Sequence, residues 1–130
     1  MSDSYIAYTK DANGLLALGK YGIGKRTEGT DTLPYNAKAN IKRFLRENSD
    51  KDILIEGDRI NNREIFDFIA ALGVEVKLYI VVCSLKTSME RLRAAGSTIT
   101  PKFVKATKTK SKRIYLEYAR RFNGEVIRTD

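Results

Sequence analysis

The chain has 130 residues, of which 42% are hydrophobic, so we expect one domain with a modest core. Its net charge of +8 favours polyanionic partners, such as nucleic acid, nucleotides or an anionic surface. The absence of histidine excludes Ser-His catalysis and the usual zinc sites, and no apolar run is long enough to span a membrane, so no membrane partner is expected.

The first quarter of the sequence predicts a β-hairpin and then a long loop. Two short apolar segments within residues 5–21 flank the Asn13-Gly14 pair, which is favoured in tight hairpin turns. The loop, residues 19–33, is rich in glycine and charge and has no hydrophobic period. Loops of this length in a compact domain are usually functional or mobile.

Residues 34–130 are expected to form an α/β core that begins with a helix and a strand. Apolar side chains recur at helical spacing over residues 37–45. A short aliphatic run then predicts a buried strand over residues 53–57.

The next helix and strand have recognisable boundaries. Asn61 or Asn62 can cap a helix that Gly73 ends. The β-branched residues 74–83 predict a long strand, in which the single Cys83 is expected to be a small buried hydrophobe rather than a reactive thiol. One cysteine excludes an internal disulfide and fits a reducing compartment, so we expect a cytoplasmic location, in the host if the gene is phage-encoded.

Two helical regions and a strand complete the chain. The segment Thr87-Ser88-Met89-Glu90 has the spacing of a capping box, inside a helical region that Gly96 closes. Thr100-Pro101 indicates the start of a helix that extends to Asn123, with room for a break. Residues 125–128 predict a last short strand.

The order of these elements is β-β-α-β-α-β-α-α-β. It predicts a three-layer α/β fold with a mostly parallel sheet and an N-terminal hairpin, all within a single domain of residues 1–130.

The most informative segment lies at the end of the strand predicted for residues 53–57. There an aliphatic run gives way to Glu56-Gly57-Asp58-Arg59. Ligands of open α/β sheets bind outside the carboxyl ends of strands, so this segment predicts a phosphate or nucleotide site, and Gly57 permits close approach of a ligand. The alternatives are a solvated Glu56, a turn role for Asp58, and an ion pair of Arg59 with either acid.

A second segment, residues 19–26, has the spacing of a phosphate-binding P-loop as far as its lysine. Arg26 then replaces the Ser or Thr that should hold magnesium. A P-loop must lead directly into a helix, and residues 27–34 are poor helix formers. We therefore do not predict a P-loop. A flexible basic loop and a substrate-facing loop, whose Lys20, Lys25 and Arg26 meet phosphates, both remain.

Four segments in order carry a family resemblance: Leu18-Gly19-Lys20-Tyr21, Gly29-Thr30-Asp31-Thr32-Leu33, Ile55-Glu56-Gly57-Asp58-Arg59 and Glu90-Arg91-Leu92-Arg93. In sequence and spacing they resemble small phage-type P-loop kinases, which are relatives of nucleotide kinases; some act on modified bases in DNA. The resemblance covers nearly all of this chain. It matches the part of such kinases that follows their first strand and helix.

The resemblance implies a role for each matching residue. Glu56 would serve magnesium or the acceptor hydroxyl, and Arg59 would face the acceptor or its phosphate. Thr30 and Asp31 would belong to the acceptor-binding loop. Arg91 and Arg93 would begin the lid that closes over the donor phosphates, so Mg²⁺ and ATP are the expected cofactors of a catalytic form, and a non-catalytic form needs none.

The chain departs from this family before Tyr5, where the first strand and the P-loop are missing. That strand normally lies in the middle of the sheet, and its loss leaves backbone groups of both neighbours without partners. We therefore expect a fragment, a chain that pairs with a companion or a second copy, or a remodelled sheet. Without a phosphate cradle, phosphotransfer by the chain alone is expected to be absent or very weak.

A second basic feature lies towards the C-terminus. Its cations are Lys102, Lys105, Lys108, Lys110, Lys112, Arg113, Arg120 and Arg121, with Glu117 as the only acid between Lys102 and Arg121. Alternating lysine and threonine over residues 107–110 suits a flexible segment that grips a nucleic-acid backbone, chiefly through Lys108, Lys110, Lys112 and Arg113. The alternative is a solvated lid or helix face.

Two further functional interpretations compete with the kinase. One is a non-catalytic phage protein that binds nucleic acid or an acidic host protein through this basic surface. The other is a structural interaction module.

Overall fold

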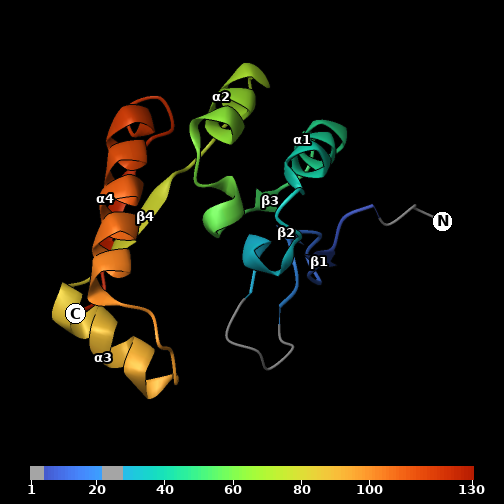
Figure 1. Cartoon of the computed structure of the whole chain (residues 1–130). Coiled ribbons are helices and arrows are strands. Elements are labelled where there is room, and N and C mark those ends of the chain that lie inside the picture. Colours follow the sequence, from blue (N-terminus) through green and yellow to red (C-terminus); the bar gives the residue numbers. More distant parts are fainter. Residues whose placement is uncertain (1–4, 22–27) are drawn as a thin grey trace. The chain divides into compact units, whose positions relative to one another are not determined.

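A computed structural model describes residues 5–21 and 28–130, and it confirms a mixed α/β class (Figure 1). The chain divides into two compact units, which we call the N-terminal unit (Met1–Val74) and the C-terminal unit (Glu75–Asp130). The expectation of a single domain, which came from chain length, stays a prediction. None of the helices in the described residues combines the length and apolar character needed to cross a membrane.

The sheet of the N-terminal unit has three short strands. The predicted hairpin is confirmed: β1 (Tyr8–Lys10) pairs antiparallel with β2 (Leu16–Leu18). The strand β3 (Ile53–Leu54) pairs parallel with β2, with Ile53 opposite Leu16. In the hairpin turn, the side-chain oxygen Oδ1 of Asp11 accepts hydrogen bonds from the backbone N–H groups of Asn13 and Leu15, at 2.9 and 2.8 Å.

Two helices supply the rest of the N-terminal core. They are α1 (Lys38–Glu47) and α2 (Arg63–Ala71), and both were predicted. Asn62 caps α2, because its side chain accepts a hydrogen bond from the backbone N–H of Ile65 at 3.0 Å. The buried apolar side chains of this core include Leu16, Leu18, Leu33, Ile41, Phe44, Leu45, Ile60, Ile65, Phe66 and Ile69.

The C-terminal unit contains one parallel strand pair and two helices. The strand β4 (Tyr79–Val82) pairs with β5 (Glu125–Arg128). The helix α3 (Leu85–Ala94) follows β4, and α4 (Pro101–Tyr118) precedes β5. The Thr100 cap of α4 is confirmed: its side chain accepts a hydrogen bond from the backbone N–H of Phe103 at 3.2 Å. The buried side chains of α4 are Val104, Ile114 and Tyr118.

The described strands form two sheets, one of three strands and one of two, and each contains one parallel pair. The strands predicted for residues 53–57 and 74–83 are both shorter in the structure, as β3 and β4. A strand extends only as far as a neighbour continues the hydrogen-bond ladder, and the neighbour of β4 is a strand of four residues.

Two local predictions in the C-terminal unit are wrong. The cap of α3 is Ser84 rather than Thr87, since the Ser84 side chain accepts the hydrogen bond from the Thr87 N–H at 3.1 Å. The lysine-threonine segment, residues 107–110, is not flexible coil but the middle of α4. Its local sequence is polar, yet the buried residues Val104 and Ile114 on either side hold it in the helix.

We expect Asn62→Ala to lower the free energy of unfolding by about 1 kcal/mol, because α2 loses its capping acceptor. Chemical denaturation followed by circular dichroism measures the change. Asn62→Asp keeps the capping oxygen but loses the hydrogen bond from the Asn62 side-chain nitrogen to the Arg59 carbonyl at 3.1 Å, so we expect a smaller loss than in Asn62→Ala. Equal losses in the two variants would contradict the assigned cap.

Candidate functional site

The two segments that the sequence singled out in the N-terminal unit meet in the structure. The 3-10 turn η1 (Thr30–Thr32) lies against the 3-10 turn η2 (Asp58–Ile60). The backbone N–H and the hydroxyl of Thr30 both donate to the carbonyl oxygen of Glu56, at 2.9 and 2.6 Å. The Asp31 carboxylate accepts the N–H of Asp58 at 2.8 Å. We call this hydrogen-bonded pair of segments, residues 29–33 and 56–60, the loop–turn junction.

Two glycines make this close approach possible. Gly57 has a φ of 114°, and a Cβ atom there would collide with the Thr30 hydroxyl oxygen. A Cβ atom on Gly29 would lie 2.8 Å from Cγ of Glu56. Both contacts are shorter than real Cβ atoms tolerate, so the junction depends on glycine at each position.

The carboxylate of Glu56 lies at the surface of the junction. Its Oε1 accepts a hydrogen bond from the Tyr21 hydroxyl at 3.0 Å. The pKa of Tyr21 is raised well above its usual value, first by burial and then by its hydrogen bond to Glu56. Tyr21 therefore remains a neutral donor, and it fixes one oxygen of Glu56 while the residue stays exposed.

The guanidinium of Arg59 is held on the same turn. Its Nε donates to the carbonyl oxygen of Leu33 at 3.2 Å, and one terminal nitrogen lies 4.0 Å from the Asp31 carboxylate. Its central carbon lies 4.0 Å from the ring centre of Tyr35, a side chain that is 91% exposed. Asp31 is therefore an acidic neighbour of Arg59, whereas the sequence suggested an ion pair with Glu56 or Asp58. The Tyr35 ring adds a cation–π contact.

Lys20 contributes to the junction through its backbone. Its N–H donates to the Thr32 hydroxyl at 2.9 Å, and its carbonyl accepts the N–H of Gly29 at 3.1 Å. The Lys20 side chain is exposed. Arg26 and Lys25, the other predicted phosphate contacts of this loop, lie outside the described residues. From Glu28 to Ala37 the only helical element is the turn η1, in keeping with the rejection of a P-loop.

The junction can recognise a hydroxyl and a phosphate, but it does not by itself fit magnesium-ATP. An exposed carboxylate can accept a hydrogen bond from a hydroxyl, and a guanidinium can pair with a phosphate. Among the described residues no group of three or more His, Cys, Asp or Glu side chains could hold a metal. Glu56 would have at most one further such ligand among the described residues, so a magnesium ion there would depend on water and on the phosphates of a nucleotide.

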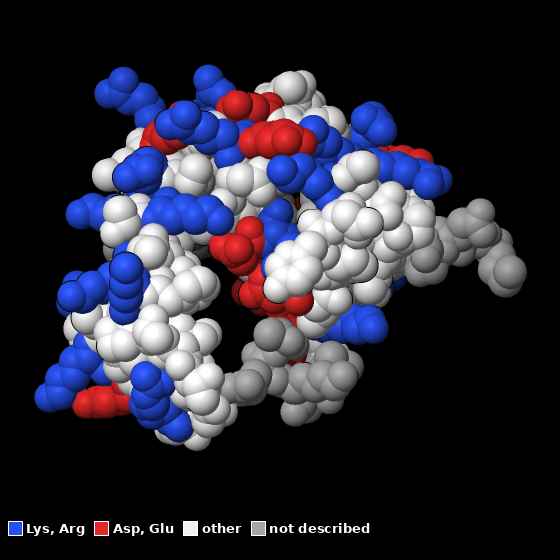
Figure 2. Space-filling view, viewed as in Figure 1, with Lys and Arg blue, Asp and Glu red and all other residues white. Residues whose placement is uncertain are grey.

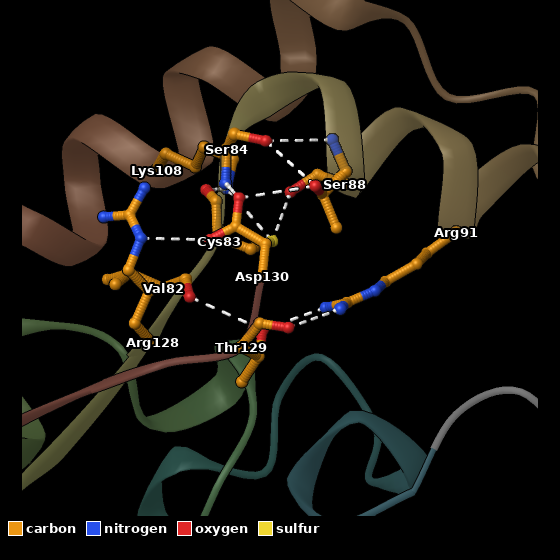
Figure 3. A network of polar contacts seen from close by, with 10 residues as sticks. Val82, Cys83, Ser84, Ser88, Arg91, Lys108, Arg128, Thr129 and Asp130 are labelled. Carbon is orange, nitrogen blue, oxygen red and sulfur yellow. Dashed lines mark hydrogen bonds and ion pairs between the residues drawn. The ribbon is translucent and has the colours of Figure 1, made fainter.

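The two arginines predicted for a lid both donate hydrogen bonds within the C-terminal unit, and Figure 3 shows those of Arg91. Arg91, on α3, donates to the hydroxyl and the carbonyl oxygen of Thr129, at 2.9 and 2.7 Å. Arg93 donates to the carbonyl oxygen of Ser97 at 2.8 Å. In this arrangement both guanidinium groups stabilise backbone segments of their own unit.

Asp130 organises a polar network at the carboxyl ends of β4 and β5 (Figure 3). Its Oδ2 accepts the backbone N–H of Ser84 at 2.7 Å and the Thr87 hydroxyl at 3.3 Å. Its Oδ1 lies 3.0 Å from Nε of Arg128. These contacts lower the pKa of Asp130 to about 2, chiefly through the backbone N–H of Ser84. The carboxylate also lies at the N-terminus of α3, where negative charge is favoured.

Cys83 is half-buried beside this network, not the fully buried hydrophobe that its sequence context predicts. Its sulfur lies 2.9 Å from the Ser88 hydroxyl, and the Lys108 ammonium donates to its carbonyl oxygen at 2.8 Å. The Ser88 hydrogen bond and then the positive charge of Lys108 lower the pKa of the thiol, against the effect of burial. These residues line an apolar groove of about 350 Å³ together with Leu92 and Phe103.

The predicted nucleic-acid contacts on α4 separate into two kinds. Lys108 is half-buried and engaged with Cys83. The side chains of Lys110, Lys112 and Arg113 are exposed. The helix therefore directs one of the four cations into the fold and leaves the other three at the surface.

No family model, no curated protein and no solved structure matches the chain. The kinase resemblance therefore stays a prediction.

Several residues of these clusters were not identified from the sequence. Tyr35 stands alone after a proline, and only the folded loop brings it over Arg59. Asp130 lies 46 residues from Ser84. The sequence offered one indication of the contact between Tyr21 and Glu56, since both residues belong to the segments that resemble the kinases.

We expect Gly57→Ala to lower the free energy of unfolding of the N-terminal unit by about 2–6 kcal/mol, from backbone strain and the clash with Thr30. Gly73→Ala is the matched control, because Gly73 also has positive φ but a Cβ atom there would have no neighbour within 4 Å. The control is expected to cost about 1–2 kcal/mol. Denaturant titration compares the variants, and equal costs would contradict the tight approach at the junction.

Asp130 predicts a pH dependence of stability in the C-terminal unit. Its folded pKa of about 2 is below the usual 3.8, so its stabilising contribution is complete above pH 4 and is lost as the pH falls towards 2. The wild type is expected to lose more stability than Asp130→Asn over this range. Thermal melts of both proteins between pH 5 and 2 measure the difference, and parallel pH profiles would contradict the assigned network.

Proposed function

We propose that the N-terminal unit is the acceptor-binding part of a phosphotransferase related to P-loop kinases, with a nucleotide or a DNA base as its acceptor. With this function we also propose the kinase relationship itself and a three-layer fold with a mostly parallel sheet. The chain alone lacks a donor cradle among its described residues, so a companion chain or a second copy would supply it.

The observation that carries the proposal is the loop–turn junction. The four residues assigned to the acceptor on resemblance are Thr30, Asp31, Glu56 and Arg59. Thr30 donates to the Glu56 carbonyl oxygen, Asp31 accepts the N–H of Asp58 and lies 4.0 Å from Arg59, and Arg59 donates to the Leu33 carbonyl oxygen. A solvated strand end would not need such contacts. The junction leaves the Glu56 carboxylate exposed and holds the Arg59 guanidinium between the Asp31 carboxylate and the Tyr35 ring.

Each group has a role that its chemistry suits. Glu56 accepts a hydrogen bond from the acceptor hydroxyl, and Tyr21 orients it from the other side. Arg59 pairs with an acceptor phosphate through the donors that point away from Leu33. The exposed ring of Tyr35 offers a surface on which a base can stack. The alternative, a purely structural turn, explains the hydrogen bonds between the segments but not the exposed Glu56 carboxylate held by the Tyr21 hydroxyl, nor the exposed Tyr35 ring over Arg59.

The proposal predicts that the chain binds a nucleoside monophosphate without a donor. Thymidine monophosphate and adenosine monophosphate are titrated into ¹⁵N-labelled protein, and amide shifts are expected in residues 20–21, 28–35 and 56–60. Magnesium-ATP alone is expected to bind weakly or not at all in calorimetry, and phosphotransfer by the isolated chain to be absent or very weak, because the cradle is missing. Amide shifts confined to other residues, or none at millimolar nucleotide, would overturn the acceptor site.

Substitutions separate the two roles. Arg59→Lys keeps the charge but loses the planar fork, and we expect about tenfold weaker binding of the monophosphate, while Arg46→Ala, on α1, changes nothing. Glu56→Gln keeps the fold and weakens nucleotide binding through loss of the carboxylate acceptor. Circular dichroism confirms that each variant is folded. If Arg46→Ala weakened binding as much as Arg59→Lys, the attraction would be general electrostatics rather than the junction.

A further inference from the structure

The net positive charge of the chain comes from one of its two units. The C-terminal unit has thirteen Lys and Arg against five Asp and Glu, whereas the N-terminal unit has eleven of each. The net charge of +8 therefore belongs to residues 75–130. Charge concentrated in this way produces a local field that attracts polyanions, which an evenly mixed surface does not.

The helix α4 carries much of this charge on its outer face. At 3.6 residues per turn, Lys102, Lys105, Lys112 and Arg113 lie opposite the buried residues of the helix, and all four side chains are exposed. None of the four takes part in an ion pair with another described residue. Figure 2 shows Lys and Arg side chains in succession along the left edge, where Figure 1 places α4.

The side chains at the centre of this face are short. Ala106 and Thr109, both small and exposed, lie among the four cations, and the Thr109 hydroxyl turns back to the Lys105 carbonyl at 3.0 Å. A polymer backbone can therefore approach the helix between the longer side chains. The cations extend from residue 102 to 113, roughly 16 Å along the axis, which is room for a few successive phosphates.

An exposed aromatic ring, Phe103, lies on the flank of α4, between this face and the buried side of the helix. Phe103 is 60% exposed, although other apolar residues of α4, such as Val104 and Ile114, are buried. The ring also borders the groove between α3 and α4. A phenyl ring held at a helix surface beside cations is a stacking platform for an unpaired base.

We propose that the outer face of α4, formed by Lys102, Lys105, Lys112 and Arg113 with Phe103 on the adjoining flank, binds single-stranded nucleic acid. The cations hold successive phosphates, and Phe103 stacks on one base. A duplex keeps its bases stacked on one another and cannot use Phe103, and an acidic protein segment has neither the spacing of phosphates nor a base. The proposal does not depend on the acceptor site of the N-terminal unit.

The first test measures the affinity of the full chain for a labelled 15-nucleotide oligothymidine by fluorescence anisotropy, at several salt concentrations. For single strands, each phosphate contact lowers the logarithm of the affinity by about 0.7 when the salt concentration rises tenfold. Four cations therefore predict a slope of about −3 in a plot of log affinity against log salt concentration. The triple variant Lys105→Gln, Lys112→Gln, Arg113→Gln is expected to lower the slope to about −1. The control Lys10→Gln, Lys38→Gln, Lys51→Gln removes the same charge from the N-terminal unit and is expected to leave the slope unchanged.

The second test isolates the aromatic contact. Phe103→Ala is expected to weaken oligothymidine binding by about tenfold, within the range known for one stacked base. Leu116→Ala is its matched control, because Leu116 is an apolar residue of α4 with similar exposure, 67% against 60%, and has no ring to stack. Phe103→Ala is expected to leave the salt slope unchanged, since no phosphate contact is lost.

The following results would overturn the proposal. Binding that does not change with salt, or that the triple variant retains, would exclude a phosphate-binding face on α4. Equal affinity for a duplex of the same length would exclude the single-strand assignment. Equal affinity for polyglutamate would show a general polyanion surface, suited to an acidic protein. Loss of nucleotide binding at the loop–turn junction would leave these outcomes unaffected, so the two proposals fail separately.

Discussion

The carbonyl group of Glu56 joins the two irregular segments of the N-terminal unit. It accepts both polar hydrogens of Thr30, a residue with no exposed surface, and the short contact requires that Gly57 have no side chain. Because a buried hydroxyl without a partner is costly, the two segments are held together or not formed at all. The direction of the Glu56 side chain and the position of Arg59 on the next turn both follow from this one attachment.

Around this attachment, charge is handled in two different ways. Arg59 lies half-buried, where a lone cation is unfavourable, and the Leu33 carbonyl, the Asp31 carboxylate and the Tyr35 ring compensate for lost water. On α4 the side chains of Lys102, Lys105, Lys112 and Arg113 extend into solvent, and none of them forms an ion pair with another described residue. In the N-terminal unit a charged side chain is fixed in position by local contacts, whereas in the C-terminal unit the exposed cations create a positive electrostatic potential at the surface.

What the sequence predicted correctly depended on neighbouring residues. The Asn62 and Thr100 caps, the hairpin and the strand at residues 125–128 each follow from a few adjacent side chains. The segment Glu56-Gly57-Asp58-Arg59 was also identified, because an acid and a glycine after an aliphatic run are unusual, whereas residues 29–33 were singled out by the family resemblance. What failed depended on distant partners: the lengths of β3 and β4, the choice of Ser84 as a cap beside Asp130, the place of Tyr35 over Arg59, and the division into two sheets.

The parallel pairing of β4 with β5 has a consequence for how the C-terminal unit forms. Tyr79 lies opposite Glu125, so this sheet closes a loop of more than 40 residues before it gains a single ladder bond. The helix α4 needs only local contacts and can form much earlier, whereas strand closure across such a separation is slow. Until it occurs, β4 has two open edges and bears Tyr79 and Val81, which remain 53% and 64% exposed even in the folded chain. Nascent or partly unfolded chains would therefore associate through β4, and the rate of self-association would be governed by how quickly β5 arrives.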